Sequence, residues 1–106
     1  MKISQNDSFF MDYAIRLASR NLGNTGENPS VGCVITSENK IISIGMTGRS
    51  GSPHAEFNAI NNIKNFPKNT TAYVTLEPCS HTGKNPSCAK LFIEKQVKRV
   101  VIAQKD

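Results

Sequence analysis

The spacing of apolar residues divides the chain into helical and extended segments. Residues 7–21 have an apolar side chain every three or four positions, which predicts an amphipathic helix with Asp7 or Ser8 as its cap. The predicted apolar face of that helix consists of Phe10, Tyr13, Ala14, Leu17 and Ala18. Two runs rich in β-branched residues follow, 31–36 and 41–47, and the polar residues between them predict a hairpin.

The rest of the chain alternates between the two patterns. Residues 54–65 and 88–96 are typical of helices, whereas 71–77 and the short apolar run 99–104 are typical of strands, the last in a buried parallel position. The apolar side of the first of these helices consists of Ala55, Ala59, Ile60 and Ile63. Strands that alternate with helices predict helices on both faces of the sheet. We therefore expect one α/β domain over residues 1–106, a three-layer α/β/α sandwich around a mixed sheet of about four strands.

Composition fits one small domain. The chain has 106 residues, of which 38% are hydrophobic, and no apolar run approaches the length of a membrane span. Its N-terminal stretch lacks the apolar segment of a signal peptide, so we expect a soluble protein of the cytoplasm with no membrane partner. Three cysteines in that setting favour a metal site or a reactive thiol over disulfides.

The net charge of +5 arises largely from basic residues near the C-terminal end of the chain. They are Lys90, Lys95, Lys98, Arg99 and Lys105. We interpret them as a solvated helix face, supported by the i,i+4 spacing of Glu94 and Lys98, rather than as a nucleic-acid site.

Three candidate metal ligands stand at junctions between predicted elements. His54 opens a helix, Cys79 follows a strand, and Cys88 opens the next helix. One imidazole and two thiolates form a zinc site whose fourth position stays open, the arrangement of catalytic zinc. Glu56, two residues after His54, can serve as a general acid and base. The order His-x-Glu and then Pro-Cys is that of zinc deaminases, although eight residues rather than two separate the cysteines here.

Each of these residues also has an ordinary interpretation. His54 alone is typical of a helix cap or a surface residue, and the two cysteines could be buried thiols. Glu56 alone is an acidic residue that the helix dipole favours in a first turn. Their combination and order favour the zinc site. Cys33 differs because it lies inside an apolar strand, and we expect it to be a packed core thiol.

Three stretches carry a resemblance to a known family. They read NPSVGCVI, SPHAEFNAI and TAYVTLEPCSHTGKNPSCAKLFIEKQVKRVVIA. From Tyr13 to Asp106 the chain resembles the pyrimidine deaminase domain of riboflavin biosynthesis, diaminohydroxyphosphoribosylaminopyrimidine deaminase, a branch of the cytidine deaminase-like superfamily. The insert between the two cysteines is the most specific element, because other branches typically have two residues there.

The resemblance implies an activity and a set of substrate contacts. The activity is zinc-dependent hydrolytic deamination of 2,5-diamino-6-ribosylamino-4(3H)-pyrimidinone 5′-phosphate, with Glu56 as the proton carrier. His81 and Lys84 would contact the ribose phosphate, the amide of Asn28 would read the heterocycle, and the N–H of Ala55 would orient the ligand. Taken alone, Lys84 is a solvated loop residue and Asn28 an ordinary turn residue.

The sequence departs from the family pattern at two places. The family usually has Gly-Tyr-His after the second strand, where this chain has Gly45-Met46-Thr47. Thr47 keeps a hydroxyl for the substrate but not the imidazole. The family also continues with Asp-Pro-Asn-Pro, a further strand and helix, and commonly a reductase domain, and Asp106 aligns with the first residue of that motif, itself a substrate contact. We therefore expect the strand at 99–104 to lie at or near a sheet edge, and we expect a homo-oligomer.

Three hypotheses follow from these features. The leading one is the riboflavin-pathway deaminase, acting on a small phosphorylated pyrimidine and impaired if the missing segments are needed. The second is a deaminase of another nucleotide or a tRNA base, against which the long insert argues. The third is a zinc-stabilised remnant or interaction module without catalysis. Glu56 argues against this third hypothesis, because structural zinc needs no proton carrier.

Overall fold

A computed structural model gives the fold of the chain. It describes residues 5–20, 22–23, 30–48, 54–76 and 87–103. The elements are α1 (Gln5–Arg20), β1 (Gly32–Ser37), β2 (Lys40–Met46), α2 (Ala55–Asn61), β3 (Thr70–Val74), α3 (Cys88–Glu94) and β4 (Arg99–Ile102). This order is the predicted one, but α2, β3, α3 and β4 each end before the predicted residue. No helix within the described ranges has the length and apolar character needed to cross a membrane.

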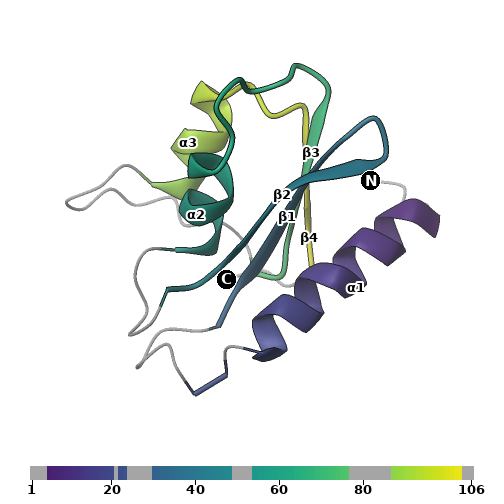
Figure 1. Ribbon diagram of the computed structural model, residues 1–106, viewed down its shortest axis with the longest axis vertical. Coiled ribbons are helices and arrows are strands. Elements are labelled where there is room, and N and C mark those ends of the chain that lie inside the picture. Colours follow the sequence, from purple (N-terminus) through teal and green to yellow (C-terminus); the bar gives the residue numbers. More distant parts are fainter. Residues whose placement is uncertain (1–4, 21, 24–29, 49–53, 77–86, 104–106) are drawn as a thin grey trace.

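The strands form one mixed sheet in the order β2-β1-β3-β4. β1 runs antiparallel to both β2 and β3, whereas β4 runs parallel to β3. Helix α1 covers one face of the sheet, and α2 and α3 cover the other (Figure 1). The predicted three-layer α/β/α sandwich is therefore confirmed. β4 is parallel and lies at an edge, as expected, but only Val101 of this strand is fully buried, because an edge strand has a neighbour on one side only.

The predicted hairpin is confirmed between β1 and β2. Its two-residue turn consists of Glu38 and Asn39, both with positive φ, 52° and 63°. This is the backbone combination whose twist matches that of the flanking strands. The hairpin places residues that alternate along β1 on opposite faces of the sheet.

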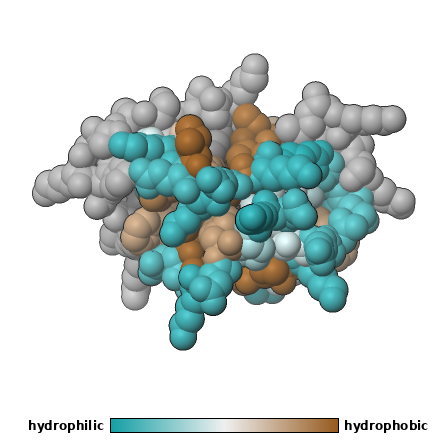
Figure 2. Space-filling model, turned by 90° about the horizontal axis from the view of Figure 1, so that it is seen from above, coloured by the Kyte–Doolittle hydropathy of each residue, from teal (hydrophilic) through white to brown (hydrophobic). Residues whose placement is uncertain are grey.

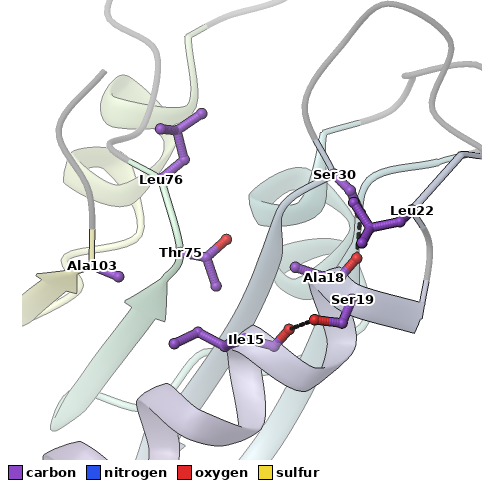
Figure 3. A pocket seen from close by; sticks show the side chains of 8 residues that line it. All are labelled: Ile15, Ala18, Ser19, Leu22, Ser30, Thr75, Leu76 and Ala103. Carbon is purple, nitrogen blue, oxygen red and sulfur yellow. Dashed lines mark hydrogen bonds between the residues drawn. The ribbon is translucent and has the colours of Figure 1, made fainter.

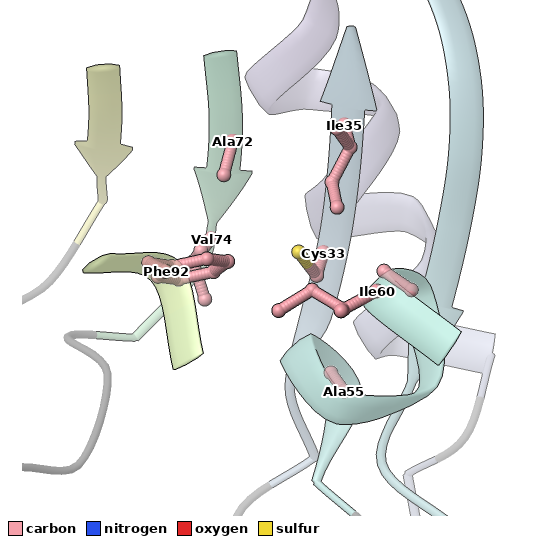
Figure 4. Close-up of a cluster of buried hydrophobic side chains, with 8 residues drawn as sticks. Cys33, Ile35, Ala55, Ile60, Ala72, Val74 and Phe92 are labelled. Atoms are coloured by element: carbon pink, nitrogen blue, oxygen red, sulfur yellow. The ribbon is translucent and has the colours of Figure 1, made fainter. Parts of the chain in front are cut away.

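Each face of the sheet has its own hydrophobic core. On the α1 side the buried residues are Phe10, Ala14, Leu17, Val34, Tyr73 and Val101. On the other side they are Cys33, Ile35, Ala55, Ala59, Ile60, Ala72, Val74 and Phe92 (Figure 4). Tyr13, which we expected on the buried face of α1, is 39% exposed, and Ala18 is only half-buried. The helix contacts the sheet through a narrower row at i, i+4 and i+7.

Asp7 is not the helix cap that its position suggested. α1 begins at Gln5, so Asp7 lies within the first turn, and its side chain is buried. Its carboxylate accepts two hydrogen bonds from the guanidinium of Arg99, at 2.8 and 2.6 Å, and one from the hydroxyl of Tyr73 at 2.6 Å. Ser8 is exposed and lies inside the helix as well. Asp7 thus joins α1 to the two parallel strands.

Two glycines allow the helices to lie close to the hairpin. A β-carbon on Gly32 would collide with the backbone of α1 at Ala14, and one on Gly45 would collide with the backbone of α2 at Ala55 and Ala59. Side chains at these two positions would push the helices away from the sheet.

Helix α2 is also hydrogen-bonded to β2, the other edge strand. The side-chain amides of Asn58 and Asn62, one turn apart, donate to the carbonyls of Met46 at 2.7 Å and Ile44 at 3.4 Å. Thr47 bonds toward β1, so the alternation of an antiparallel ladder directs the Met46 and Ile44 carbonyls outward. These two outward carbonyls of β2 are therefore occupied by side chains of α2.

The face of the molecule at the C-terminal ends of α2 and α3 is mostly hydrophilic, with a few hydrophobic side chains among the hydrophilic ones (Figure 2). Lys64, Lys95 and Lys98 are exposed. The predicted helix pair of Glu94 and Lys98 was wrong, because α3 ends at Glu94. Arg99 was also misplaced on a solvated face, since it is bonded to Asp7.

Candidate zinc centre

The candidate residues gather at one end of the sheet. Gly32, at the start of β1, is paired with Met46 at the end of β2, and Cys33 is paired with Val74 at the end of β3. Helices α2 and α3 begin at this same end (Figure 1). Residues that are far apart in the sequence therefore meet where strands end and helices start, as expected for an active site in an α/β fold.

His54 occupies the position immediately before α2, in an extended conformation with φ −68° and ψ 156°. Its side chain makes no capping hydrogen bond to the helix. Its Nδ1 instead lies 3.6 Å from Sγ of Cys88, the first residue of α3. His54 therefore occupies the N-cap position and is exposed, as the ordinary interpretation allows, but its side chain lies against Cys88 instead of capping the helix.

The separation of these two atoms fits a shared zinc ion. Zinc lies about 2.3 Å from a thiolate sulfur and about 2.0–2.1 Å from an imidazole nitrogen, and at a tetrahedral angle these bonds place the two ligand atoms about 3.6 Å apart. The observed distance is 3.6 Å. Cys79, the expected third ligand, lies outside the described residues. Within the described part of the chain, no group of three possible ligands occurs.

The start of α3 favours a thiolate at Cys88. Ser87 caps the helix, with its hydroxyl accepting a hydrogen bond from the N–H of Lys90 at 3.1 Å. Cys88 follows the cap directly and is buried. Unpaired N–H groups and the helix dipole stabilise negative charge at this position. The thiol is thus placed for binding a cation.

Glu56 lies in the first turn of α2 with its side chain only 4% exposed. Burial raises the pKa of its carboxyl, and this outweighs the opposing effects of its own backbone N–H, of the positive charge of His54 and of a hydrogen bond with Cys88. A buried carboxyl group beside the two candidate metal ligands is placed to accept a proton and to return it. This is the behaviour required of a general acid and base.

Cys33 is fully buried in the core, as expected. Burial raises the pKa of its thiol well above the usual value, and the negative charges of Glu56 and Cys88 raise it further. Cys33 therefore adjoins the centre as a neutral thiol. No feature of the sequence indicates this proximity, because it depends on how β1 packs against α2 and α3.

Thr47, the expected substrate contact after β2, is buried at the same end of the sheet. Its hydroxyl accepts a hydrogen bond from the N–H of Val31 at 2.8 Å and donates to the Val31 carbonyl at 3.4 Å. Ala55 is the first residue of α2, and its side chain is in the core. The remaining expected contacts lie outside the described residues; they are Asn28, His81, Lys84 and Asp106.

A cavity of about 340 Å³ opens at this end of the sheet on the α1 side (Figure 3). Ile15, Ala18, Ser19 and Leu22 line it from the helix side, and Ser30, Thr75, Leu76 and Ala103 line it from the strand side. Ser19, Ser30 and Thr75 contribute hydroxyl groups to an otherwise largely apolar wall. The cavity therefore adjoins the segment that leads into β1.

Comparison with known families agrees with this site. Residues 4–104 match the model of the cytidine and deoxycytidylate deaminase zinc-binding region, and the chain belongs to that family. Within the family it belongs with the diaminohydroxyphosphoribosylaminopyrimidine deaminases of riboflavin biosynthesis, which confirms the resemblance noted in the sequence. Zinc is thus the metal of the centre.

Three relatives illustrate the similarity. The chain is 43% identical over 100 residues to the diaminohydroxyphosphoribosylamino-pyrimidine deaminase of Buchnera aphidicola, covering 94% of this chain and 68% of that protein. It is 44% identical over 100 residues to riboflavin biosynthesis protein RibD of Escherichia coli, covering 94% of this chain and 27% of that one. The structure of Acinetobacter baumannii RibD superposes with a TM-score of 0.87 at 44% identity, over 94% of this chain and 28% of that one. The chain thus spans about a quarter of the length of several of its relatives.

Proposed function

We propose that the chain catalyses the zinc-dependent hydrolytic deamination of 2,5-diamino-6-ribosylamino-4(3H)-pyrimidinone 5′-phosphate. One observation carries the proposal: Nδ1 of His54 and Sγ of Cys88 lie at the separation that a shared zinc ion requires, with the buried carboxyl of Glu56 beside them. The family supplies the substrate class, since its closely similar members are named as deaminases of this pyrimidine.

In the proposed reaction, some residues of the site bind the metal and another transfers protons. His54, Cys79 and Cys88 would hold zinc, which when bound would supply a Lewis acid that lowers the pKa of water. Glu56 takes one proton of the attacking water and delivers it to the ring nitrogen; it then takes the second proton from the added hydroxyl and delivers it to the departing amine. A C–O bond forms, the C–N bond to the 2-amino group breaks, and ammonia leaves.

The remaining residues of the proposal bind the substrate. Asn28 reads the heterocycle, His81 and Lys84 contact the ribose phosphate, and the N–H of Ala55 orients the ring. Asp106 is the last of these proposed contacts. We also place the protein in the cytoplasm, where thiols remain reduced, and expect it to form a homo-oligomer through the edge at β4.

The test is ammonia release from this substrate by the zinc-loaded chain, compared with Glu56→Gln. The variant keeps the shape of the side chain but cannot carry the proton, so we expect turnover to fall by at least about a thousandfold while zinc content stays near one per chain. Unchanged turnover in Glu56→Gln would contradict the mechanism. A chain that binds zinc but releases no ammonia would favour the non-catalytic module.

A further inference from the structure

The short segment of residues 30–32, which leads into β1, is held by hydroxyl groups of neighbouring elements. The N–H of Val31 donates to Oγ1 of Thr47 at 2.8 Å, and the N–H of Gly32 donates to Oγ1 of Thr75 at 3.1 Å. The hydroxyl of Thr47 also donates to the carbonyl of Val31 at 3.4 Å. Both threonines directly follow strands, Thr47 after β2 and Thr75 after β3. The backbone N–H groups of the same threonines donate to the carbonyls of Val31 at 3.0 Å and Gly32 at 3.1 Å, so the hydroxyls add a second set of hydrogen bonds to this segment.

A third hydroxyl fixes the segment to α1. Oγ of Ser30 donates to the carbonyl of Ala18 at 2.6 Å, across the cavity wall seen in Figure 3. Ser19 lines the same cavity, but its hydroxyl donates to the carbonyl of Ile15 within α1 itself, at 3.0 Å. Of these two serine hydroxyls, that of Ser30 connects residues 30–32 to α1, whereas that of Ser19 bonds within the helix.

Thr47 connects the same segment to the helix that carries the zinc ligand. The residue before it, Met46, accepts a hydrogen bond from the side-chain amide of Asn58 on α2 at 2.7 Å. The backbone N–H of Asn58 in turn donates to the carbonyl of His54 at 3.1 Å. A short series of hydrogen bonds therefore runs from His54 through β2 and Thr47 to Val31.

We propose that Thr47 is a positioning residue. Its hydroxyl fixes residues 30–32 relative to α2, and Asn28 precedes this segment by two residues in the sequence. The inference rests on the proposed function, in which Asn28 binds the phosphorylated pyrimidine. It assigns Thr47 to substrate affinity through Val31 rather than to contact with the substrate, and it makes Ser30 a second residue with the same effect.

The two roles predict different behaviour of variants. If Thr47 contacts the substrate, KM should change in Thr47→Val but not in Ser30→Ala. If it positions the segment, removal of the Ser30 hydroxyl acts in the same direction, although that hydroxyl bonds to Ala18 on α1. Ser19→Ala is the matched control, because it removes a hydroxyl from the same cavity wall without detaching the segment.

The experiment measures KM and kcat of the zinc-loaded chain for the diaminopyrimidine phosphate in Thr47→Val, Thr47→Ser, Ser30→Ala and Ser19→Ala. Loss of one such hydrogen bond is expected to raise KM about fivefold in Thr47→Val and in Ser30→Ala, with kcat within about twofold. Thr47→Ser keeps the hydroxyl and should stay near the parent value, as should Ser19→Ala. Hydrogen exchange at the Val31 amide, followed by NMR without substrate, should accelerate in Thr47→Val but not in Thr47→Ser.

The outcomes separate this inference from the proposed function. A KM change confined to Thr47→Val, with Ser30→Ala unaffected, would overturn positioning in favour of direct contact. An unchanged KM in both, or unchanged exchange at Val31 in Thr47→Val, would also overturn it. If Thr47→Val does not fold, Ser30→Ala against Ser19→Ala decides the question. Absence of Glu56-dependent ammonia release from the unaltered chain would overturn the proposed function and this inference together.

Discussion

Asp7 on α1 and Arg99 on β4 form a bidentate ion pair that joins the first helix to the last described strand, with nitrogen–oxygen distances of 2.8 and 2.6 Å. The carboxylate of Asp7 is buried, whereas the side chain of Arg99 is 34% exposed. Because Arg99 is partly solvated, the pair avoids much of the desolvation penalty that a fully buried pair would incur. The pair therefore stabilises the attachment of an edge strand.

Replacing Asp7 with Asn should destabilise the chain. The amide cannot accept both hydrogen bonds of the guanidinium as a charged group does, so we expect a loss of about 2 kcal/mol in the free energy of unfolding. Urea unfolding measures this loss, and Asp12→Asn on the exposed side of the same helix is the control. Equal stability of the two variants would show that the pair is not stabilising.

Tyr73 should make stability fall at high pH. Burial, followed by the hydrogen bond and the charge of Asp7, raises the pKa of its phenol from 10.0 to about 12. In that window the unfolded chain has lost the phenolic proton and the folded chain retains it, so stability is full below pH 10 and is lost as pH rises toward 12. Urea midpoints of the parent and of Tyr73→Phe between pH 8 and about pH 11 test this. The parent should lose more stability than the variant, and parallel curves would contradict the assignment.

Thr70→Val should stabilise the protein. The hydroxyl of Thr70 is fully buried and has no hydrogen-bond partner among the described residues. Valine has nearly the same shape and removes the unsatisfied polar group, for an expected gain of about 1 kcal/mol in unfolding free energy. Ser43→Ala provides the contrast, because the Ser43 hydroxyl is buried but donates to the carbonyl of Ala59 at 2.6 Å. That variant should lose stability, and a loss in Thr70→Val as well would contradict the prediction.

Two of the cysteines should respond oppositely to replacement. Cys88→Ala removes a proposed zinc ligand, so zinc retained after dialysis against a weak chelator should fall from about one per chain to near zero. Cys33→Ala removes a core thiol that adjoins the centre without being a proposed ligand, so its zinc content should stay near one per chain. Metal analysis of both variants measures this directly. Loss of zinc in Cys33→Ala with the fold intact would place Cys33 among the ligands.

The elements could be predicted from the sequence because their signals are local. The β-branched runs of β1 and β2, the polar residues between them and the helical spacing of Phe10, Ala14 and Leu17 each lie within one segment. His54 and Glu56 could be proposed as site residues for the same reason, because their spacing lies within one segment. The ends of α2 and β3 were placed too far along, since apolar side chains continue past the last helical or ladder hydrogen bond, as Ile63 does after α2.

What the sequence could not provide are interactions between distant segments. The partner of Asp7 is Arg99, at the opposite end of the chain, and this pairing converts an apparent helix cap into a buried ion-pair residue. From the sequence, Thr47 was likewise expected to contact the substrate in place of the histidine usual in the family. Only the fold reveals its hydrogen bonds with Val31. The approach of His54 to Cys88 was expected from chemistry, but its distance required the packing of α2 beside α3.

The side-chain amides of Asn58 and Asn62 make the two edges of the sheet unequal as places where a further strand could pair. A strand that added to β2 would compete with these side chains for the Met46 and Ile44 carbonyls. Two hydrogen bonds within the protein would have to break before the new backbone hydrogen bonds could form. A strand arriving at β4 meets no such competition from these two amides. Extension of the sheet, whether by another copy or by another segment, is thereby biased toward β4, the strand that Arg99 attaches to α1. This leaves α2 and the proposed zinc ligand His54 before it undisturbed.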